Sequence, residues 1–480
     1  MTLIFDNRYD ALGERFYASL YPDPLPDPKA VIFNDDALES LGLSQYSLDD
    51  LLSFFSGNAL PEGAAPLAMV YAGHQFGGYS PQLGDGRGIL IGQIRNKEGT
   101  LIDLHLKGAG KTPFSRMGDG RAVLRSCIRE FLASEALHHL GIPSTRALAV
   151  TTSNEPVQRE TIENASMLMR FSESHIRFGS FEYFAYTEQI DELRQLCDYT
   201  LENHFPLIAQ NETKYDDLVI TVAEKTGSLI AQWQAFGFAH GVMNTDNMSI
   251  IGQTFDYGPY GFMEKFDPYY ICNHSDDRGR YAFNRQPLIG HWNCQALAQA
   301  LSSLITSDAA KNMLKAYQDN FIKTYHTLMC RKLGLMENIN GDKELYEDLL
   351  DLMEGYGIDY TIFFRSLSQY HLHEDIGTIC IIKSCANDFA PWFKRYNERL
   401  TLESLNDKAR HELMKKINPK YILRNYLAQV AIQNSENGDH SELARLYNVL
   451  KNPYSEQPEF DSYAAETPPW GQHLQISCSS

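Results

Sequence analysis

A glycine-rich loop followed by a hairpin that ends in lysine is the feature that most constrains how this chain can fold. Residues 84–88 read Gly-Asp-Gly-Arg-Gly, and the apolar segment 89–94 follows. A turn at 96–99 leads into 100–107, where apolar and polar residues largely alternate. Two such runs joined by a short polar turn predict a β-hairpin. Because glycine lacks a Cβ, the loop before the hairpin can let backbone amides approach phosphate groups.

The rest of the chain continues this order of elements. Residues 121–140 repeat apolar side chains at helical spacing, which predicts a helix. Further strands are expected near 146–152 and 167–171, and from about residue 185 onward the pattern is mostly helical. An irregular stretch, 239–262, interrupts the helical half. Glycine loop, hairpin with lysine, helix, strands and a helical half with an acidic loop predict an α+β, two-lobed, protein-kinase-like fold.

This interpretation divides the chain into four parts. We expect an N-terminal extension over 1–80, a kinase-like N-lobe over 81–185, a helical C-lobe with the catalytic and metal loops over 186–451, and a C-terminal tail over 452–480.

Charge and composition exclude several classes of partner. Lysine and arginine number 42 against 61 aspartate and glutamate, so the formal net charge is −19. This balance argues against a broad nucleic-acid-binding face, although a local basic pocket remains compatible with it. No apolar run is long enough to span a membrane. The first residues resemble neither a signal nor a transit peptide, and the eight cysteines form no CxxC pair. We therefore expect a cytoplasmic protein with reduced thiols and neither nucleic-acid nor membrane partners.

Lys107 ends the predicted hairpin, as the phosphate-binding lysine of kinases ends a strand. Such a lysine needs a carboxylate on the next helix, and Glu130 is the candidate. A solvent-facing glutamate beside Arg129 is the structural alternative. A P-loop at 107–112 is disfavoured, because His105 stands where that motif needs its first glycine.

Two acidic motifs in the irregular stretch form the strongest local signal. Residues 244–247 read Asn-Thr-Asp-Asn and 255–258 read Phe-Asp-Tyr-Gly, with a short apolar strand expected at 248–251. Phosphoryl-type transfer uses a divalent metal bound by carboxylate and amide oxygens, and a carboxylate near the attacking hydroxyl. Asp246 and Asp256 supply such groups. A pair of ordinary turns is the structural alternative, because these residue types are common in turns.

Arg170 and Arg177 lie in one short segment of an acidic chain. Guanidinium groups bind phosphate bidentately, so both are candidate phosphate clamps. The alternative is a surface ion pair with Glu173. Near the C-terminus, Cys478 could pair reversibly with Cys272, which follows the Asp256 loop, although two unrelated thiols are the simpler interpretation for a cytoplasmic protein.

Several long motifs resemble those of the selenoprotein O family, whose bacterial branch ends in cysteine where some members carry selenocysteine. The resemblance covers nearly the whole chain. Its motifs are Tyr-Ala-Gly-His-Gln-Phe-Gly at 71–77, Gln-Leu-Gly-Asp-Gly-Arg at 82–87, Leu-Lys-Gly-Ala-Gly at 106–110, Gly-Asp-Gly-Arg at 118–121, His-Gly-Val-Met-Asn-Thr-Asp-Asn-Met at 240–248, Asp-Tyr-Gly at 256–258 and the terminal Cys-Ser-Ser.

The resemblance implies a kinase-like enzyme that binds ATP in an inverted orientation and moves AMP onto serine, threonine or tyrosine hydroxyls of proteins. Transfer of UMP from UTP is also implied, as is Mg²⁺ or Mn²⁺ as the metal. It implies a role for each matching residue: Lys107, Arg170 and Arg177 bind the buried terminal phosphates, Gly84, Gly86, Arg87, Asp119 and Gly120 make further nucleotide contacts, Glu130 holds Lys107, Asp246 is the general base, and Asn247 with Asp256 binds the metal beside the nucleotide.

Two other classes stay open at this point. An ordinary kinase-like phosphotransferase would present the γ-phosphate to Asp246. A pseudokinase scaffold would bind nucleotide and transfer nothing, although it would not need the intact set of lysine, base and metal residues. The chain also departs from ordinary kinases, because no His-Arg-Asp precedes Asp246 and the candidate metal asparagine follows it by one residue instead of five.

Overall fold

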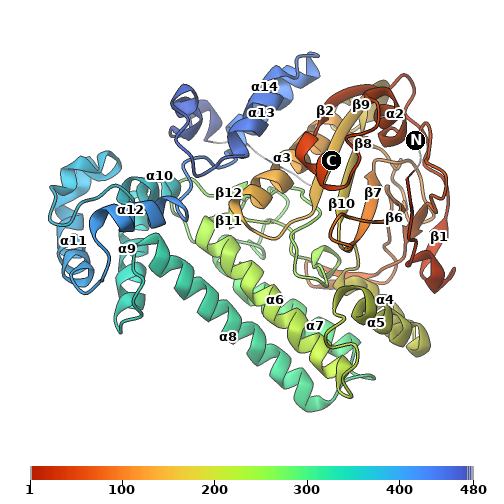
Figure 1. The fold of residues 1–480 in the computed structure, drawn as a ribbon, viewed down its shortest axis with the longest axis horizontal. Coiled ribbons are helices and arrows are strands. Elements are labelled where there is room, and N and C mark those ends of the chain that lie inside the picture. The colour runs from red at the N-terminus through yellow and green to blue at the C-terminus, as the bar shows by residue number, and fades with distance from the viewer. Residues whose placement is uncertain (1–2, 473, 475, 477–480) are drawn as a thin grey trace.

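The computed structural model describes residues 3–472, 474 and 476, and it consists of a sheet-rich part and a largely helical part (Figure 1). The expected mixture of helices and antiparallel strands is confirmed. Among the described residues, no helix combines the length and apolar character that crossing a bilayer requires.

One antiparallel sheet contains most of the strands, and it includes three from the first 80 residues. Its path runs β1-β3-β6-β7-β10-β9-β2, with β8 paired to β10. Its strands are β1 Tyr17–Ser19, β2 Lys29–Phe33, β3 Leu67–Met69, β6 Gly88–Arg95, β7 Leu101–Lys107, β8 Ala122–Val123, β9 Arg146–Gln158 and β10 Ile162–Ser172. The expected domain boundary at residue 80 therefore separates, along the chain, strands that pair in one sheet.

Two small ribbons lie outside the main sheet. Strands β4 (Gly73–Gln75) and β5 (Gly78–Ser80) form a hairpin, and β11 (Phe238–Ala239) pairs with β12 (Gly261–Phe262). In the main sheet, Lys107 is the last residue of β7, the middle strand of the path. Its backbone lies opposite Gly88 on one side and Leu168 on the other. The predicted hairpin is confirmed, and the sheet fixes the position of its terminal lysine.

Fourteen α-helices are found among the described residues, most of them after residue 177. They are α1 Asp35–Ser40, α2 Leu48–Phe55, α3 Leu124–Leu140, α4 Phe178–Tyr186, α5 Ile190–His204, α6 Lys214–Phe236, α7 Gln286–Ala300, α8 Ser307–Lys332, α9 Asp342–Tyr356, α10 Tyr360–Leu367, α11 Ala386–Leu400, α12 Asp407–Lys415, α13 Asn425–Glu436 and α14 Ser441–Leu450.

The predicted helix after the hairpin, α3, begins at Leu124 and ends before Gly141, whose φ of +81° is the left-handed conformation that favours glycine. It packs against β9 and β10 on one side and against α13 and α14 on the other (Figure 1). Its apolar stripe is buried, and so are two carboxylates, Glu130 and Glu135. A fully buried carboxylate needs a partner of opposite charge, so the sheet must supply cations to this helix.

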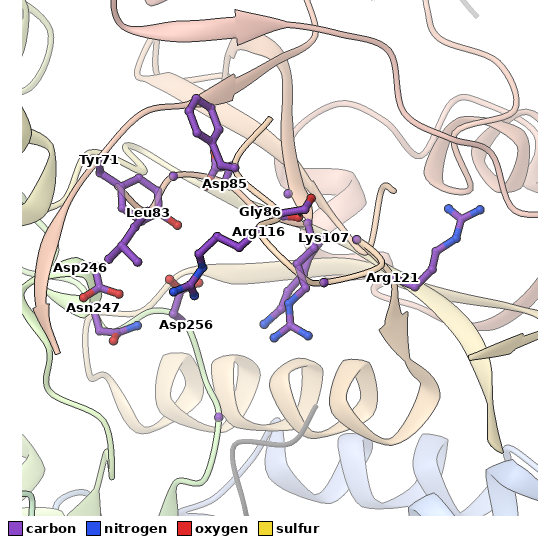
Figure 2. A pocket seen from close by; sticks show the side chains of 18 of the residues that line it. Tyr71, Leu83, Asp85, Gly86, Lys107, Arg116, Arg121, Asp246, Asn247 and Asp256 are labelled. Carbon is purple, nitrogen blue, oxygen red and sulfur yellow. The ribbon is translucent and has the colours of Figure 1, made fainter. Parts of the chain in front are cut away.

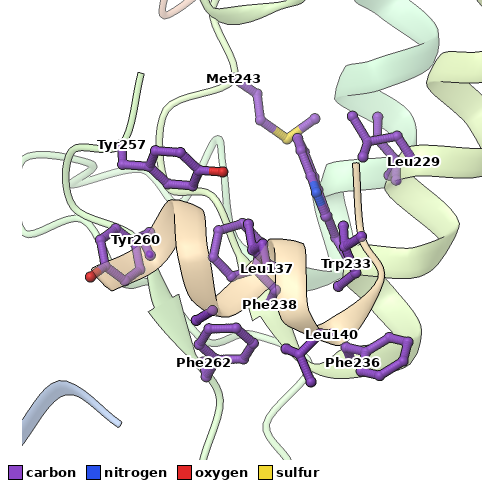
Figure 3. Close-up of a cluster of buried hydrophobic side chains, with 14 of the residues drawn as sticks. Leu137, Leu140, Leu229, Trp233, Phe236, Phe238, Met243, Tyr257, Tyr260 and Phe262 are labelled. Carbon is purple, nitrogen blue, oxygen red and sulfur yellow. The ribbon is translucent and has the colours of Figure 1, made fainter. Parts of the chain in front are cut away.

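A cluster of large apolar side chains joins the sheet-rich part to the helical part, next to the irregular stretch 239–262 (Figure 3). Leu137 and Leu140 from α3 meet Trp233 from α6, and the β11–β12 ribbon contributes Phe238 and Phe262. This shared core fixes the loops that leave the ribbon relative to α3.

The short strand expected at 248–251 is not present. These residues bend, and Ser249 makes only an isolated bridge with Arg177. Met248 and Ile250 are apolar because they enter the core, so burial without strand pairing explains the pattern that predicted a strand.

Replacing Trp233 with alanine tests the role of the shared core. Trp233 is 1% exposed, and its indole nitrogen donates to Thr254 Oγ1 at 2.9 Å. The variant should lose about 3–5 kcal/mol of folding free energy. The midpoint of urea unfolding measures this loss. Trp470→Ala is the matched control, because Trp470 is 55% exposed and its loss should shift the midpoint much less. Equal shifts would contradict the assignment of this core.

Candidate active site

A cavity of about 640 Å³ opens between the sheet and the loops of the helical part (Figure 2). Its volume lies in the range typical of small-molecule sites. Eleven of the residues singled out in the sequence line it: Gly84, Gly86, Arg87, Lys107, Asp119, Gly120, Arg170, Arg177, Asp246, Asn247 and Asp256. Glu130 lies beneath this lining, and Cys272 is not part of it.

Lys107 and Glu130 form a buried ion pair between β7 and α3. Glu130 is 1% exposed, so the alternative of a solvent-facing glutamate is wrong. Its second oxygen accepts from Arg170 at 2.8 Å. Burial acts to raise the pKa of Glu130, but Lys107 and Arg170 outweigh it and hold the pKa below its usual value. The carboxylate is therefore ionised, and it fixes two cations at the floor of the cavity.

Asp256 lies between the two arginines. Its Oδ1 accepts from Arg170 at 2.6 Å and its Oδ2 from Arg177 at 2.7 Å. Both arginines are almost fully buried, so the alternative surface pairing with Glu173 is wrong. Burial opposes ionisation of Asp256, yet Arg177 and Arg170 hold its pKa well below the usual value.

Asp85 and His105 belong to the same charge network, and the sequence reasoning missed both. Asp85 accepts from the Met69 amide at 3.0 Å and lies 3.8 Å from Arg177. His105 contacts Asp85 at 3.4 Å and accepts from Arg170 Nε at 3.3 Å. Burial and the nearby arginine lower the pKa of His105 to about 4, so the ring is neutral. Since alternate residues of a strand share a face, the spacing of His105 from Lys107 was a usable signal.

Asp246 belongs to a short 3₁₀ turn, Thr245–Asn247, and its carboxylate has only weak protein support. Gln75 donates to Oδ2 at 3.1 Å, while Oδ1 has no hydrogen-bond partner among the described residues. Burial raises the pKa of Asp246 to about 6, and the bond from Gln75 opposes that rise. A carboxyl that titrates near neutral pH, next to a cavity, has the properties of a general base.

The β4–β5 hairpin holds the Asp246 turn in place. The amide of His74 donates to Thr245 Oγ1 at 2.7 Å, and Thr245 in turn donates to Glu182 on α4 at 2.5 Å. The His74 ring contacts the other oxygen of Glu182 at 2.7 Å. The first of these contacts joins residues 171 positions apart in sequence, and the two contacts with Glu182 join residues 63 and 108 positions apart. No local pattern near Asp246 could have predicted them.

The glycine loop carries a second loop, residues 112–118, over the cavity. A Cβ at Gly84 would overlap the Phe114 ring, and one at Gly86 would lie 2.9 Å from the Phe114 carbonyl oxygen. Thr112 also donates to the Asp85 carbonyl at 2.7 Å. The glycines are therefore needed for this close packing, in addition to any approach by phosphate. From this second loop the Arg116 side chain points into the cavity (Figure 2), a contribution the sequence reasoning missed.

Exposure changes along the cavity. Lys107, Arg170 and Arg177 are each at most 9% exposed. At the other end, the Asp119 side chain is 43% exposed and pairs with Arg159 at 2.7 Å. The cations therefore lie at the closed end, and the Asp119 turn lies at the open end.

The oxygen donors of Asn247 and Asp256 suit a hard divalent cation. Both line the cavity, and Asp256 is ionised. No cluster of three or more histidine, cysteine, aspartate or glutamate side chains in the described ranges could hold a metal by itself. The donor atoms of these two side chains fit a divalent cation that takes its remaining ligands from other molecules.

The expected cysteine pair is described only in part. Cys272 is buried, with its sulfur 3.5 Å from the Ala239 carbonyl oxygen. Cys478 lies outside the described residues. Nearby, the His274 amide donates to the carbonyl of Ile476 at 2.9 Å, so the end of the described chain lies against the Cys272 loop.

Comparison with known proteins identifies the family of this chain. A family profile described as "Protein adenylyltransferase SelO" matches residues 1–451. A protein of Pseudomonas entomophila, named protein nucleotidyltransferase YdiU, is 51% identical over 480 residues, which is 100% of this chain and 99% of the relative. Proteins of the same name are 50% identical over 486 residues in Pseudomonas putida and 49% identical over 482 residues in Myxococcus xanthus, again covering 100% of this chain and 99% of each relative. The chain therefore belongs to the SelO family of protein adenylyltransferases.

Proposed function

We propose that this enzyme transfers AMP from ATP to serine, threonine or tyrosine hydroxyls of proteins, with the triphosphate entering the cavity first. The observation that carries this orientation is the burial of Lys107, Arg170 and Arg177 at the closed end, opposite the exposed Asp119 turn. Buried cations attract the most highly charged end of ATP. The nucleoside would then lie toward Asp119 and Gly120, with further contacts from Gly84, Gly86 and Arg87. UTP would be an alternative donor.

In this orientation the α-phosphorus lies near Asp246, and pyrophosphate is the leaving group. Asp246 accepts the proton of the acceptor hydroxyl as its oxygen attacks the α-phosphorus. Lys107, Arg170 and Arg177 stabilise the negative charge that develops on the departing pyrophosphate. Glu130 keeps Lys107 in position. Mg²⁺ or Mn²⁺ held by Asn247 and Asp256 would supply Lewis-acid stabilisation of phosphate charge.

We also propose that the arrangement of these parts is that of a two-lobed kinase. Its support is the lysine at the end of a central antiparallel strand, paired with a glutamate on the following helix. In this interpretation 81–185 is the core of the N-lobe, 186–451 is the C-lobe, and 1–80 and 452–480 are additions at either end. We place the enzyme in the bacterial cytoplasm, since the seven cysteines within the described residues are all free thiols and six are buried.

The position of the label in ATP distinguishes the proposal from its alternatives. With ATP labelled at the α-phosphate and Mg²⁺ or Mn²⁺, protein should become labelled, whereas ATP labelled at the γ-phosphate should leave protein unlabelled. Asp256→Ala should lose at least a hundredfold in transfer, because it removes both the metal carboxylate and the partner of two buried arginines. Circular dichroism checks that this variant folds. Label from the γ-position alone would identify a kinase, and ATP binding without any transfer would favour a scaffold.

The pH dependence tests the role of Asp246. The base must be deprotonated, and its pKa is raised to about 6, so kcat/KM should fall as the pH drops below 6. Gln75→Leu removes a hydrogen bond that lowers this pKa, so the acidic limb should move to higher pH. Gln158→Leu is the control, since Gln158 also lines the cavity but is not bonded to Asp246. An identical limb in all three proteins would contradict the assignment.

We further propose that Cys272 and Cys478 form a reversible disulfide. The support is the backbone hydrogen bond between His274 and Ile476, each two residues from one of the cysteines. The two thiols would lose two electrons and two protons to an added disulfide such as oxidised glutathione. A non-reducing peptide map after that treatment should contain a linked peptide with both cysteines. The linked peptide should be absent in Cys272→Ser, whereas Cys127→Ser should retain it. Identical maps with and without reductant would contradict the pairing.

A further inference from the structure

The outer face of the β4–β5 hairpin carries exposed aromatic side chains beside the proposed base. Phe76 is 46% exposed, Tyr79 36% and, on α4, Tyr186 43%. The rings of the two exposed residues Tyr79 and Tyr186 have centroids 4.8 Å apart, and the Phe76 ring centroid lies 5.1 Å from that of Tyr281, which is buried. Exposed aromatic rings that contact one another are unusual on a surface that binds nothing, because they leave apolar area in water.

Two further side chains complete this surface. Trp292 on α7 packs edge-on against His74, with ring centroids 5.3 Å apart. The Arg280 guanidinium lies 5.0 Å from the centre of the Trp292 ring, and it also approaches Gly77 at the hairpin tip. Helices α4 and α7, which carry Tyr186 and Trp292, are in contact with each other. We call this surface, formed by Phe76, Tyr79, Tyr186, Arg280 and Trp292, the hairpin face.

The hairpin face is tied to the base by direct contacts. Gln75, next to Phe76, donates to the Asp246 carboxylate at 3.1 Å. The amide of Phe76 donates to Asn244, two residues before the base, at 3.2 Å. Tyr281 donates to the same Asn244 oxygen at 2.5 Å. An acceptor hydroxyl must come within hydrogen-bond distance of Asp246, and an extended chain advances about 3.3 Å per residue. Residues one to three positions from the hydroxyl would therefore reach the hairpin face.

We propose that the hairpin face binds the acceptor protein, as an extended segment with an apolar and an acidic side chain close to the modified hydroxyl. This rests on the proposed function, and it specifies the substrate for the same site. Tyrosine, tryptophan and arginine are the residue types that dominate the energetics of protein interfaces. The aromatic rings would contact the apolar side chain, and Arg280 would pair with the carboxylate. In a chain of net charge −19, a cation among these rings favours an acidic neighbour.

Peptide pools test the apolar half of the proposal. Nonapeptides with a central Ser, Thr or Tyr, and one other position fixed in each pool, are incubated with ATP labelled at the α-phosphate. Pools with a large apolar residue near the hydroxyl should be labelled best. Phe76→Ala and Tyr186→Ser should each raise KM for the best peptide at least tenfold, with KM for ATP within twofold of wild type. Tyr356→Ala is the matched control, because Tyr356 is also 46% exposed but lies on α9, far from the hairpin face (Figure 1).

A charge reversal tests the acidic half. Arg280→Glu should remove the preference for Asp or Glu near the hydroxyl and create one for Lys or Arg. Lys311→Glu makes the same change of charge on an exposed residue of α8 and should keep the wild-type preference. Circular dichroism of Phe76→Ala, Tyr186→Ser and Arg280→Glu separates loss of contact from loss of folding.

The outcomes separate this proposal from the proposed function. Unchanged peptide kinetics in Phe76→Ala, Tyr186→Ser and Arg280→Glu would overturn the hairpin face while leaving AMP transfer intact. Label on folded proteins or on the enzyme itself, with no labelled or bound peptide pool, would overturn it in the same way. Label from the γ-phosphate alone would instead overturn the proposed function.

Discussion

The carboxylate of Asp256, held between two buried guanidinium groups, is the interaction on which the site depends. Arg170 and Arg177 carry buried charges that are costly without partners, and Asp256 supplies one oxygen to each. Glu130 and Asp85 complete the compensation from the helix and from the glycine loop. Removing one member of such a network leaves an uncompensated buried charge, which typically costs about 3–5 kcal/mol. The strands, the helix and the acidic loop are therefore coupled through charge as well as through the apolar core.

This network explains which residues could be predicted from the sequence. Lys107 and Glu130 were found because the end of a strand and the pattern of a helix can be recognised from nearby residues. Arg170 and Arg177 were found because two arginines in one short segment stand out in an acidic chain. Asp246 and Asp256 were found because two aspartates in one irregular stretch supply the carboxylates that metal-assisted transfer requires. The residues that complete the network were missed. Asp85 stood inside a motif interpreted only for its glycines, and the role of His105 depends on burial that only the assembled sheet creates.

The same limit applies to the fold. The order of elements was enough to predict mixed α and β structure, because hairpin and helix signals act over a few residues. Pairing over long distances was not predictable. Strand β2 (29–33) joins the far edge of the sheet, beside β9, although about 115 residues separate the two segments. At 248–251 the prediction was wrong because it expected a strand that is not present. An apolar run indicates burial and cannot by itself specify strand pairing.

The distribution of charge makes the two ends of the cavity different. Because the chain carries a net charge of −19, the nucleotide binding that we propose would depend on a short-range field from a few buried cations. Glu130, Asp85 and Asp256 already match the buried cations Lys107, Arg170 and Arg177, so the closed end of the cavity is close to neutral by itself. Under the proposed function, entering phosphates would compete with Asp256 for the same guanidinium groups. Relief of that pairing would leave Asp256 free to share a metal with the phosphates, and nucleotide binding would then be coupled to assembly of the catalytic centre.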